Sequence, residues 1–396
     1  MNKEKVCIGL IGCGNIGTKT AQEILNNKNL ILKKVLVKDL SKKREIPSHL
    51  LTDKASEIFD DESISVVIEV TAGEQPALDF CLQTLNAKKH FVTANKELLA
   101  KHGAQIFEVA AKNNVQVGFD GTVAGGIPII NTLQNSLSAN QVTEVIGIFN
   151  GTSNYILSEM QQGETFENAL NKAQELGYAE PDPTNDIEGV DTKYKTAILS
   201  SLISGQFVHP DKIKSEGIRF VSTEDLHFAE RLNYVIKLLG ICQLNESSEL
   251  TVGVFPAFVS KLSTVSCVNG AINVANIKGS LIEELTLVGP GAGPGPTNSA
   301  IVGDLLQIIN KQTHNHLVLQ NSSEVRFAKE PSYKFFVRLN VDDNMGVIAQ
   351  IGSILEKHEI SLESIEQELQ DKSEDDDLGT ATMVFITHLI EESKIQ

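Results

Sequence analysis

The sequence predicts an α/β protein whose N-terminal part is a parallel sheet covered by helices. The first third of the 396-residue chain alternates short β-rich runs with helical stretches, which is the rhythm of βαβ units. The first apolar run passes directly into a G-x-G-x-x-G motif at residues 12–17. After a polar stretch at 310–331, a second strand and helix pattern starts near residue 334. These observations indicate two or three domains, as the length also does.

The N-terminal elements are predicted from hydrophobic periodicity and β-branched content. Strands are expected at Val6–Ile11, Leu32–Val37, Val66–Val70, His90–Val92 and Val115–Phe119. The intervening helices are expected at Gly17–Asn26, Ala77–Leu85 and Ala104–Asn113.

The middle of the chain is expected to open with a strand at Val142–Phe149 and then to be mainly helical. Phe166–Glu175 and Thr192–Ile203 are its clearest amphipathic segments. A dense Gly/Pro loop at Gly289–Pro296 precedes an apolar helix, Asn298–Ile309. The tail elements are strand Lys334–Val341, helix Val347–His358, strand Leu362–Glu368, an acidic loop at Asp371–Asp377 and strand Ala381–His388.

Composition argues against several classes of partner. The net charge is −17, with no long basic block, so neither nucleic acid nor an anionic membrane is expected to bind. No apolar run approaches the ~18 residues of a membrane span. The five cysteines are scattered, without a CxxC pair, which fits neither a disulfide framework nor a zinc site. We expect a mature cytoplasmic protein without a signal peptide.

The glycine motif predicts a dinucleotide site. Gly12, Gly14 and Gly17 follow a strand and open a helix, where they permit a tight turn, close approach to a pyrophosphate and close helix packing. Asn15 and Ile16 lie at that helix N-terminus, whose unpaired N–H groups attract an anion.

The end of the second strand bears on the choice of coenzyme. Asp39 lies 22 residues after Gly17 and would accept a hydrogen bond from a ribose hydroxyl, as in NAD enzymes. The same turn carries four cations that would accommodate a 2′-phosphate: Lys38, Lys42, Lys43 and Arg44. The cations favour NADP, and NAD stays open.

Six further blocks suggest a family. They are TANK at 93–96, VAGGIPII at 123–130, NGTSNYIL at 150–157, GYAEPDPTNDIEGVD at 177–191, the lysine at 195, and GPGAGPGPTNSA at 289–300. In this order, over residues 6–310, the chain resembles homoserine dehydrogenase. The resemblance implies interconversion of L-homoserine and L-aspartate 4-semialdehyde with NADP or NAD, in threonine, methionine and isoleucine biosynthesis.

The resemblance also assigns roles to residues. It implies substrate contacts by Glu180, Asp186, Asp191, Lys195, Gly151, Thr152 and Tyr178. Lys195 is the first candidate for proton transfer and Lys96 the second. From spacing alone, an ordinary ion pair on one helix face is the favoured interpretation of Asp191 and Lys195. Besides the glycine motif, cofactor contacts are expected from Lys38, Thr71, Thr93, Lys96, Gly291 and Gly293.

The family resemblance further implies a monovalent cation, Na⁺ or K⁺, beside the second glycine-rich turn. Its expected ligands are Asp120, Val123, Gly125 and Ile127. This chain has Asp120 where family members have Glu, so the shorter side chain weakens the expectation.

The expected domains are a dinucleotide-binding domain (1–135 plus about 298–320), a substrate and dimerisation domain (136–297), and a tail (332–396). The tail resembles a shortened ACT domain, a ferredoxin-like fold, and suggests feedback by threonine. A homodimer or tetramer is expected, formed through the strand near 142–149 and the region before Gly289. Two alternatives remain open, another Rossmann amino-acid dehydrogenase such as an aspartate dehydrogenase, and a catalytically inactive amino-acid sensor.

Overall fold

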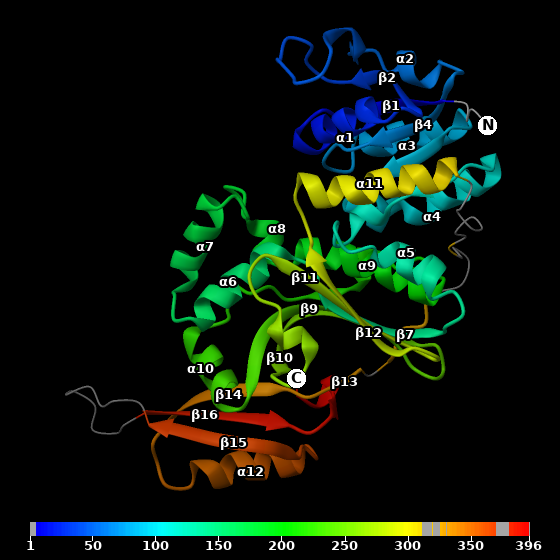
Figure 1. Ribbon diagram of the computed structural model, residues 1–396. Helices are drawn as coiled ribbons and strands as arrows, with labels where there is room; N and C mark the ends of the chain where they lie inside the picture. The colour runs from blue at the N-terminus through cyan, green and yellow to red at the C-terminus, as the bar shows by residue number, and fades with distance from the viewer. Residues whose placement is uncertain (1–4, 311–318, 320–324, 330, 370–379, 396) are drawn as a thin grey trace.

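The computed structural model describes residues 5–310, 319, 325–329, 331–369 and 380–395. It has a parallel sheet with helices at the N-terminal end, a second sheet with helices in the middle, and a small α+β unit formed by the tail (Figure 1). The predicted α/β class is confirmed. No helix in these described ranges is long and apolar enough to cross a membrane. All five cysteines are free thiols.

The first sheet is parallel throughout, because each strand is joined to the next by a crossover. Its order is β3 (Leu51–Thr52), β2 (Leu30–Leu36), β1 (Val6–Ile11), β4 (Ile64–Glu69), β5 (His90–Thr93) and β6 (Val117–Gly118). The chain runs outward from β1 to β3 and then returns to β4 on the other side of β1. In such sheets ligands bind where the order reverses, at the carboxyl ends of the strands.

Helices from the N-terminal region, together with one that follows the middle region, complete this part. They are α1 (Asn15–Asn26), α2 (Ser56–Phe59), α3 (Ala77–Asn86), α4 (Lys96–Asn113) and α11 (Pro294–Ile309). Ile301 and Leu305 of α11 pack in the same apolar core as Ile8 and Leu10 of β1. Helix α4 is one helix from Lys96 onward, longer than the expected Ala104–Asn113, because the Asn95 side chain caps its start.

The middle region was expected to be mainly helical, and this expectation is wrong. It contains a six-stranded sheet in the order β12 (Glu283–Pro290), β11 (Ile272–Gly279), β7 (Val142–Ile148), β9 (Tyr234–Leu244), β10 (Leu250–Ser260) and β8 (Lys214–Ser215). Apolar side chains lie on both faces of this sheet. A strand that is buried on both faces lacks the polar–apolar alternation that identifies a strand in a sequence.

Five helices accompany the second sheet: α6 (Gly151–Gln161), α7 (Phe166–Glu175), α8 (Thr184–Ile187), α9 (Val190–Ser204) and α10 (Thr223–Arg231), after the short α5 (Ile129–Asn131). The expected Gly/Pro loop is shorter than predicted. Strand β12 continues to Pro290 and α11 begins at Pro294, so only residues 291–293 connect them. Strand β7 pairs on one side with β11 and on the other with β9, which leaves only its face for a partner subunit.

The tail forms the sheet β14 (Phe336–Asp342), β16 (Thr380–Thr387), β15 (Leu362–Leu369) with helix α12 (Val347–Lys357), beside the short pair β13 (Ser332–Tyr333) and β17 (Ile390–Glu391). The Phe336 ring stacks on Phe258 of β10 at 4.3 Å. Arg231 of α10 forms ion pairs with Glu366 and Glu368 of β15. The expected acidic loop at 371–377 and most of the 310–331 linker lie outside the described residues.

Lys237 of β9 is a cation buried in the middle region, and no carboxylate among the described residues pairs with it. Its Nζ donates to Asn154 Oδ1 at 3.1 Å, Val268 O at 2.8 Å and Asn269 Oδ1 at 2.9 Å. Its side chain is fully buried. Burial lowers the pKa of Lys237 to about 8, since neutral oxygens compensate only part of the lost hydration.

This geometry predicts a pH dependence of stability. Between pH 8 and 10 the unfolded chain holds a proton on Lys237 that the folded chain has released, so folding is favoured as the pH rises. Relative to a Lys237→Met variant, the wild-type free energy of unfolding should increase by about 2 to 3 kcal/mol from pH 7 to pH 10. Urea titrations of both proteins measure the difference, and a constant difference across this range would contradict the lowered pKa.

Candidate active site

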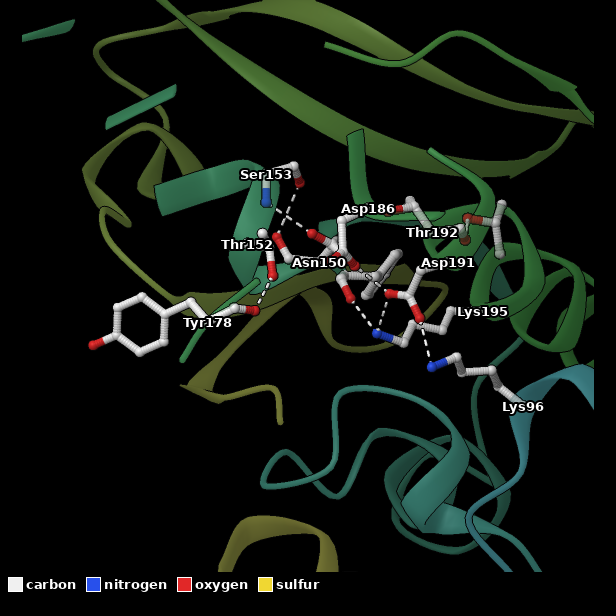
Figure 2. Close-up of polar contacts among 11 residues, drawn as sticks. Lys96, Asn150, Thr152, Ser153, Tyr178, Asp186, Asp191, Thr192 and Lys195 are labelled. Atoms are coloured by element: carbon white, nitrogen blue, oxygen red, sulfur yellow. Dashed lines mark hydrogen bonds and ion pairs between the residues drawn. The ribbon is translucent and has the colours of Figure 1, made fainter. Parts of the chain in front are cut away.

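A cluster of charged side chains forms where the first sheet meets the helices of the middle region. Lys96 is the first residue of α4, directly after β5, and reaches the cluster from the parallel sheet. Asp191 and Lys195 come from the first turns of α9, where they lie one turn apart. Figure 2 shows the two lysines converging on the Asp191 carboxylate from different elements.

Asp191 bridges the two lysines. Its Oδ1 lies 2.8 Å from Lys96 Nζ, and its Oδ2 lies 2.6 Å from Lys195 Nζ. Lys195 Nζ also donates to the carbonyl oxygen of Phe149 at 2.6 Å. Asp191 and Lys195 are buried, whereas 42% of the Lys96 side chain is exposed. The arrangement is therefore more than a surface ion pair, because one carboxylate serves two cations in a buried setting.

The two lysines have opposite pKa shifts. Burial lowers the pKa of Lys195, and the positive charge of Lys96 contributes in the same direction. The attraction of Asp191 raises the pKa of Lys96. The two lysines together hold the pKa of Asp191 below its ordinary value, despite its burial. Of the two lysines, Lys195 is therefore the one whose charged form is disfavoured by its surroundings.

Asn150 organises the carboxylates, although the sequence reasoning did not select it. Its Nδ2 donates to Asp186 Oδ1 at 2.7 Å and to Asp191 Oδ2 at 2.9 Å. Its Oδ1 accepts from the Ser153 N–H and so caps α6. Burial raises the pKa of Asp186, against the effect of the Asn150 hydrogen bond. The only signal in the sequence was a capping residue type before a helix.

The other residues expected to contact the substrate differ in where their side chains point. The Thr152 hydroxyl donates to the carbonyl oxygen of Tyr178 at 2.7 Å, which ties the start of α6, at Gly151, to the loop after α7. The Tyr178 ring points away from the lysines in Figure 2 and packs on Tyr155. Glu180 is exposed, and its side chain has no hydrogen bond to any residue that the structure describes. Its charge contributes to the raised pKa of Lys96.

The glycine motif has the geometry of an anion-binding turn. Gly12 has a φ of +96°, which an L side chain rarely adopts, and a Cβ at Gly17 would lie 2.3 Å from Gly12 O. Gly14 is exposed, and a Cβ there would have no contact within 4 Å outside its own chain neighbours and helix backbone. Helix α1 begins at Asn15 and Ile16 without a side-chain cap. Its N-terminal N–H groups are therefore open to a phosphate.

Glu69 links two of the threonines expected at the cofactor, and it too was missed. It ends β4 fully buried, and it accepts from the hydroxyls of Thr71 and Thr93. Burial raises the pKa of Glu69. Asn95 donates from Nδ2 to Gly73 O at 2.7 Å while it caps α4. These contacts fix the loop after β4 and the position of Lys96.

In the turn after β2, Asp39 and Arg44 form hydrogen bonds within their own loop. The Asp39 carboxylate accepts from the Ser41 N–H and hydroxyl, so it is bonded within its own loop. Arg44 Nη1 donates to the carbonyl oxygens of Asp39 and Lys42. Lys38 is exposed at the end of the strand.

Two of the residues expected to bind a cation, Asp120 and Ile127, already accept hydrogen bonds from backbone N–H groups. Asp120 is buried, and its Oδ1 accepts from the Ile130 and Asn131 N–H groups. Burial raises the pKa of Asp120 to about 6. The Ile127 carbonyl accepts from the Ile129 N–H. Gly125 packs against the turn before α11, since a Cβ there would lie 3.2 Å from Gly291 O.

The parallel sheet with its open glycine turn, beside a buried lysine and carboxylate, defines a dinucleotide-dependent dehydrogenase. Comparison with known proteins makes this specific. The family models "Homoserine dehydrogenase, NAD binding domain" and "Homoserine dehydrogenase" match residues 12–120 and 128–306. The chain belongs to the homoserine dehydrogenase family.

Individual relatives cover nearly the whole chain. A homoserine dehydrogenase of Bacillus subtilis is 35% identical over 96% of this chain and 91% of its own length. One from Synechocystis is 37% identical over 98% and 93%. The crystal structure of a homoserine dehydrogenase from Thiobacillus denitrificans has a TM-score of 0.88 and 34% identity, covering 99% of this chain and 93% of its own. The similarity includes the tail.

The double role of Asn150 leads to a prediction on stability. The Asn150→Asp substitution keeps a side-chain oxygen that can cap α6. It replaces the amide that donates to Asp186 and Asp191 with a third carboxylate that faces them. We expect a loss of about 2 kcal/mol in the free energy of unfolding at pH 8. The loss should shrink towards pH 5, because a carboxyl whose pKa is raised in the folded state takes up a proton there.

Asn150→Ser is the matched control, since it keeps a capping oxygen and adds no charge. Its cost should vary less over this pH range than that of Asn150→Asp, because it removes the donor to Asp186 but adds no third carboxylate. Urea unfolding at pH 5 and 8 measures both variants, and equal pH profiles for the two would contradict the role assigned to the Asn150 amide.

Proposed function

We propose that this chain interconverts L-homoserine and L-aspartate 4-semialdehyde with Lys195 as the proton-transfer group. The observation that carries the proposal is the buried Lys195, held at 2.6 Å from Asp191 beside the crevice of a dinucleotide-binding sheet. The nicotinamide of the bound cofactor supplies or accepts the hydride. The chain must then orient the substrate and move one proton at its oxygen.

Lys195 is suited to transfer that proton. Two of its three N–H groups are directed to Asp191 and Phe149, so one remains for the substrate oxygen. In homoserine oxidation the neutral amine takes the hydroxyl proton, and in the reverse direction the ammonium returns it. Its lowered pKa makes the neutral form accessible. Lys96, whose pKa is raised, fits a permanently charged role beside Asp191.

The amino-acid end of the substrate carries one ammonium and one carboxylate. Asp186 and Glu180 supply negative charge for the ammonium, with Asp191 held between the lysines. The N-terminus of α6, at Gly151 and Thr152, favours a carboxylate. The alternatives of another amino-acid dehydrogenase or of an inactive sensor would leave this arrangement without a use.

For the coenzyme we propose a preference for NADP. Asp39 is bonded within its own turn, while Lys38 is exposed at the end of β2, where a 2′-phosphate would lie. A monovalent cation would have to share Asp120 and Ile127 with hydrogen bonds already made, and the proposed mechanism does not use one.

The remaining proposals concern assembly and control. The division into residues 1–135 with about 298–320, 136–297 and 332–396 is supported by the two sheets and the separate tail. We also propose that the chain forms a dimer or tetramer through the face of the second sheet, that it acts in the cytoplasm, and that the tail is a shortened ACT-like unit that binds threonine. The tail contains one full helix, α12, among its described residues.

Substitution of the two lysines separates their roles. Lys195→Met should lower turnover in both directions at least about 100-fold, the usual range for loss of an acid–base group, and Lys96→Met should also lower turnover. Neither should weaken NADPH binding to a comparable degree. Steady-state kinetics and fluorescence titration with NADPH measure the two effects, and near-normal turnover in both variants would reject the assignment.

The pH dependence of the residual activity of Lys96→Met tests whether Lys195 titrates during homoserine oxidation. Without the neighbouring charge the pKa of Lys195 should rise, so the acidic limb of homoserine oxidation should move to higher pH. A limb that stays in place would show that Lys195 does not titrate in this step.

The coenzyme proposal predicts that NADP is used more efficiently than NAD with L-homoserine. Lys38→Ala should raise KM for NADP about tenfold and leave KM for NAD within about twofold, because one phosphate contact is lost. Lys28→Ala is the control, since Lys28 is an exposed lysine just before β2, at its other end. Equal effects of the two substitutions would contradict a phosphate contact at Lys38.

A further inference from the structure

Asn273 is a buried polar side chain with no assigned use. It lies on β11 opposite Gly289 of β12, and 1% of its surface is exposed. Neither its Nδ2 nor its Oδ1 has a hydrogen-bond partner among the residues that the structure describes. A buried amide without partners costs about 1–3 kcal/mol, so its presence in a well-packed strand needs a reason.

The other buried asparagines show that this is unusual. In the described part of the chain they are Asn95, Asn150, Asn154, Asn276 and Asn298. The amide of each is hydrogen-bonded. Asn276 is the closest comparison, because it lies three residues further along the same strand and donates to Glu284 and Thr286. Asn273 alone in this set keeps both amide atoms free.

The Asn273 amide lies directly beneath the turn between β12 and α11. A Cβ at Gly291 would be 2.0 Å from Asn273 Nδ2 and 2.3 Å from Oδ1, so only glycine fits over this amide. Gly293 has a φ of +105° and precedes the uncapped N-terminus of α11. The turn also contacts the second glycine-rich turn, since Pro290 O accepts from the Gly126 N–H.

This turn faces a ligand-binding region. Helix α11 packs on α1, where Asn298 joins Thr20 at 2.7 Å, and α1 begins at the open glycine motif. Two uncapped helix N-termini, those of α1 and α11, therefore belong to one packed unit. An anionic dinucleotide is the ligand chemistry that such termini favour.

We propose that Asn273 is a positioning residue for the cofactor. Its amide forms hydrogen bonds with the backbone of the 291–293 turn when that turn settles against the bound dinucleotide. The structure as described has no hydrogen bond between this turn and the Asn273 amide. Closure of the turn thus gains hydrogen bonds that the free protein lacks, which favours the bound state. The inference rests on the proposed function only in that the chain binds a nicotinamide dinucleotide.

Leucine at this position tests the proposal, because it fills a similar volume without polar atoms. Asn273→Leu should leave the melting temperature of the free protein unchanged or higher, since an unpaired amide is removed. The dissociation constant for NADPH, measured by calorimetry, should rise about tenfold. KM for homoserine at saturating NADPH should stay within about twofold of wild type.

Asn276→Leu is the matched control on the same strand. It should lower the melting temperature, because Glu284 and Thr286 lose a donor, and it should leave the NADPH dissociation constant within about twofold. If Asn273→Leu binds NADPH as tightly as wild type, or loses as much stability as Asn276→Leu with unchanged binding, the residue is merely structural and the proposal is wrong.

If Asn273→Leu does not fold, a second pair of variants tests the proposal. Gly291→Ala should weaken NADPH binding strongly in wild type, where its Cβ meets the Asn273 amide, and cost much less in an Asn273→Ala background. Additive effects would overturn the proposed contact. Wild type provides the reference throughout. If wild type bound neither NADPH nor NADH, the proposed function would fail, whereas tight wild-type binding with unaffected variants rejects the inference about Asn273 alone.

Discussion

The structure of the site depends on one buried carboxylate shared by two ammonium groups. A buried carboxylate such as Asp191 needs partners on its oxygens to remain ionised. Removal of one member of such a buried pair typically costs about 3–5 kcal/mol of stability. Lys195 comes from the same helix, and Lys96 comes from the parallel sheet. The electrostatic requirement therefore joins the cofactor-binding part of the chain to the middle region.

Close packing of α9 on the second sheet supports this arrangement. Gly240 of β9 has no room for a side chain, since a Cβ there would be 2.3 Å from Thr196 Oγ1. The helix consequently lies close enough to the end of β7 for Lys195 Nζ to reach the Phe149 carbonyl. Asn150 follows immediately and holds two carboxylates. A backbone requirement in the sheet thus sets the geometry of a side-chain site.

Much of this organisation could be predicted from the sequence, and the exceptions have physical causes. The parallel sheet, the glycine turn and the spacing of Asp191 and Lys195 follow from local patterns. Strands β9 and β10 were missed because burial on both faces removes alternation. Asn150 and Glu69 were missed because their partners are distant along the chain, as in the bond between Glu69 and Thr93. Hydrogen bonds of this kind leave no periodic signal.

The buried lysines show why position alone does not define a proton-transfer group. Lys237 and Lys89 donate to neutral oxygens, and burial lowers the pKa of each. Lys195 differs because it also faces a carboxylate, which keeps the ammonium available, and a second lysine, which opposes it. The net result of these competing effects is a lowered pKa of Lys195. Lys237, enclosed by amide and carbonyl oxygens, has a lowered pKa and no carboxylate at its ammonium group among the described residues.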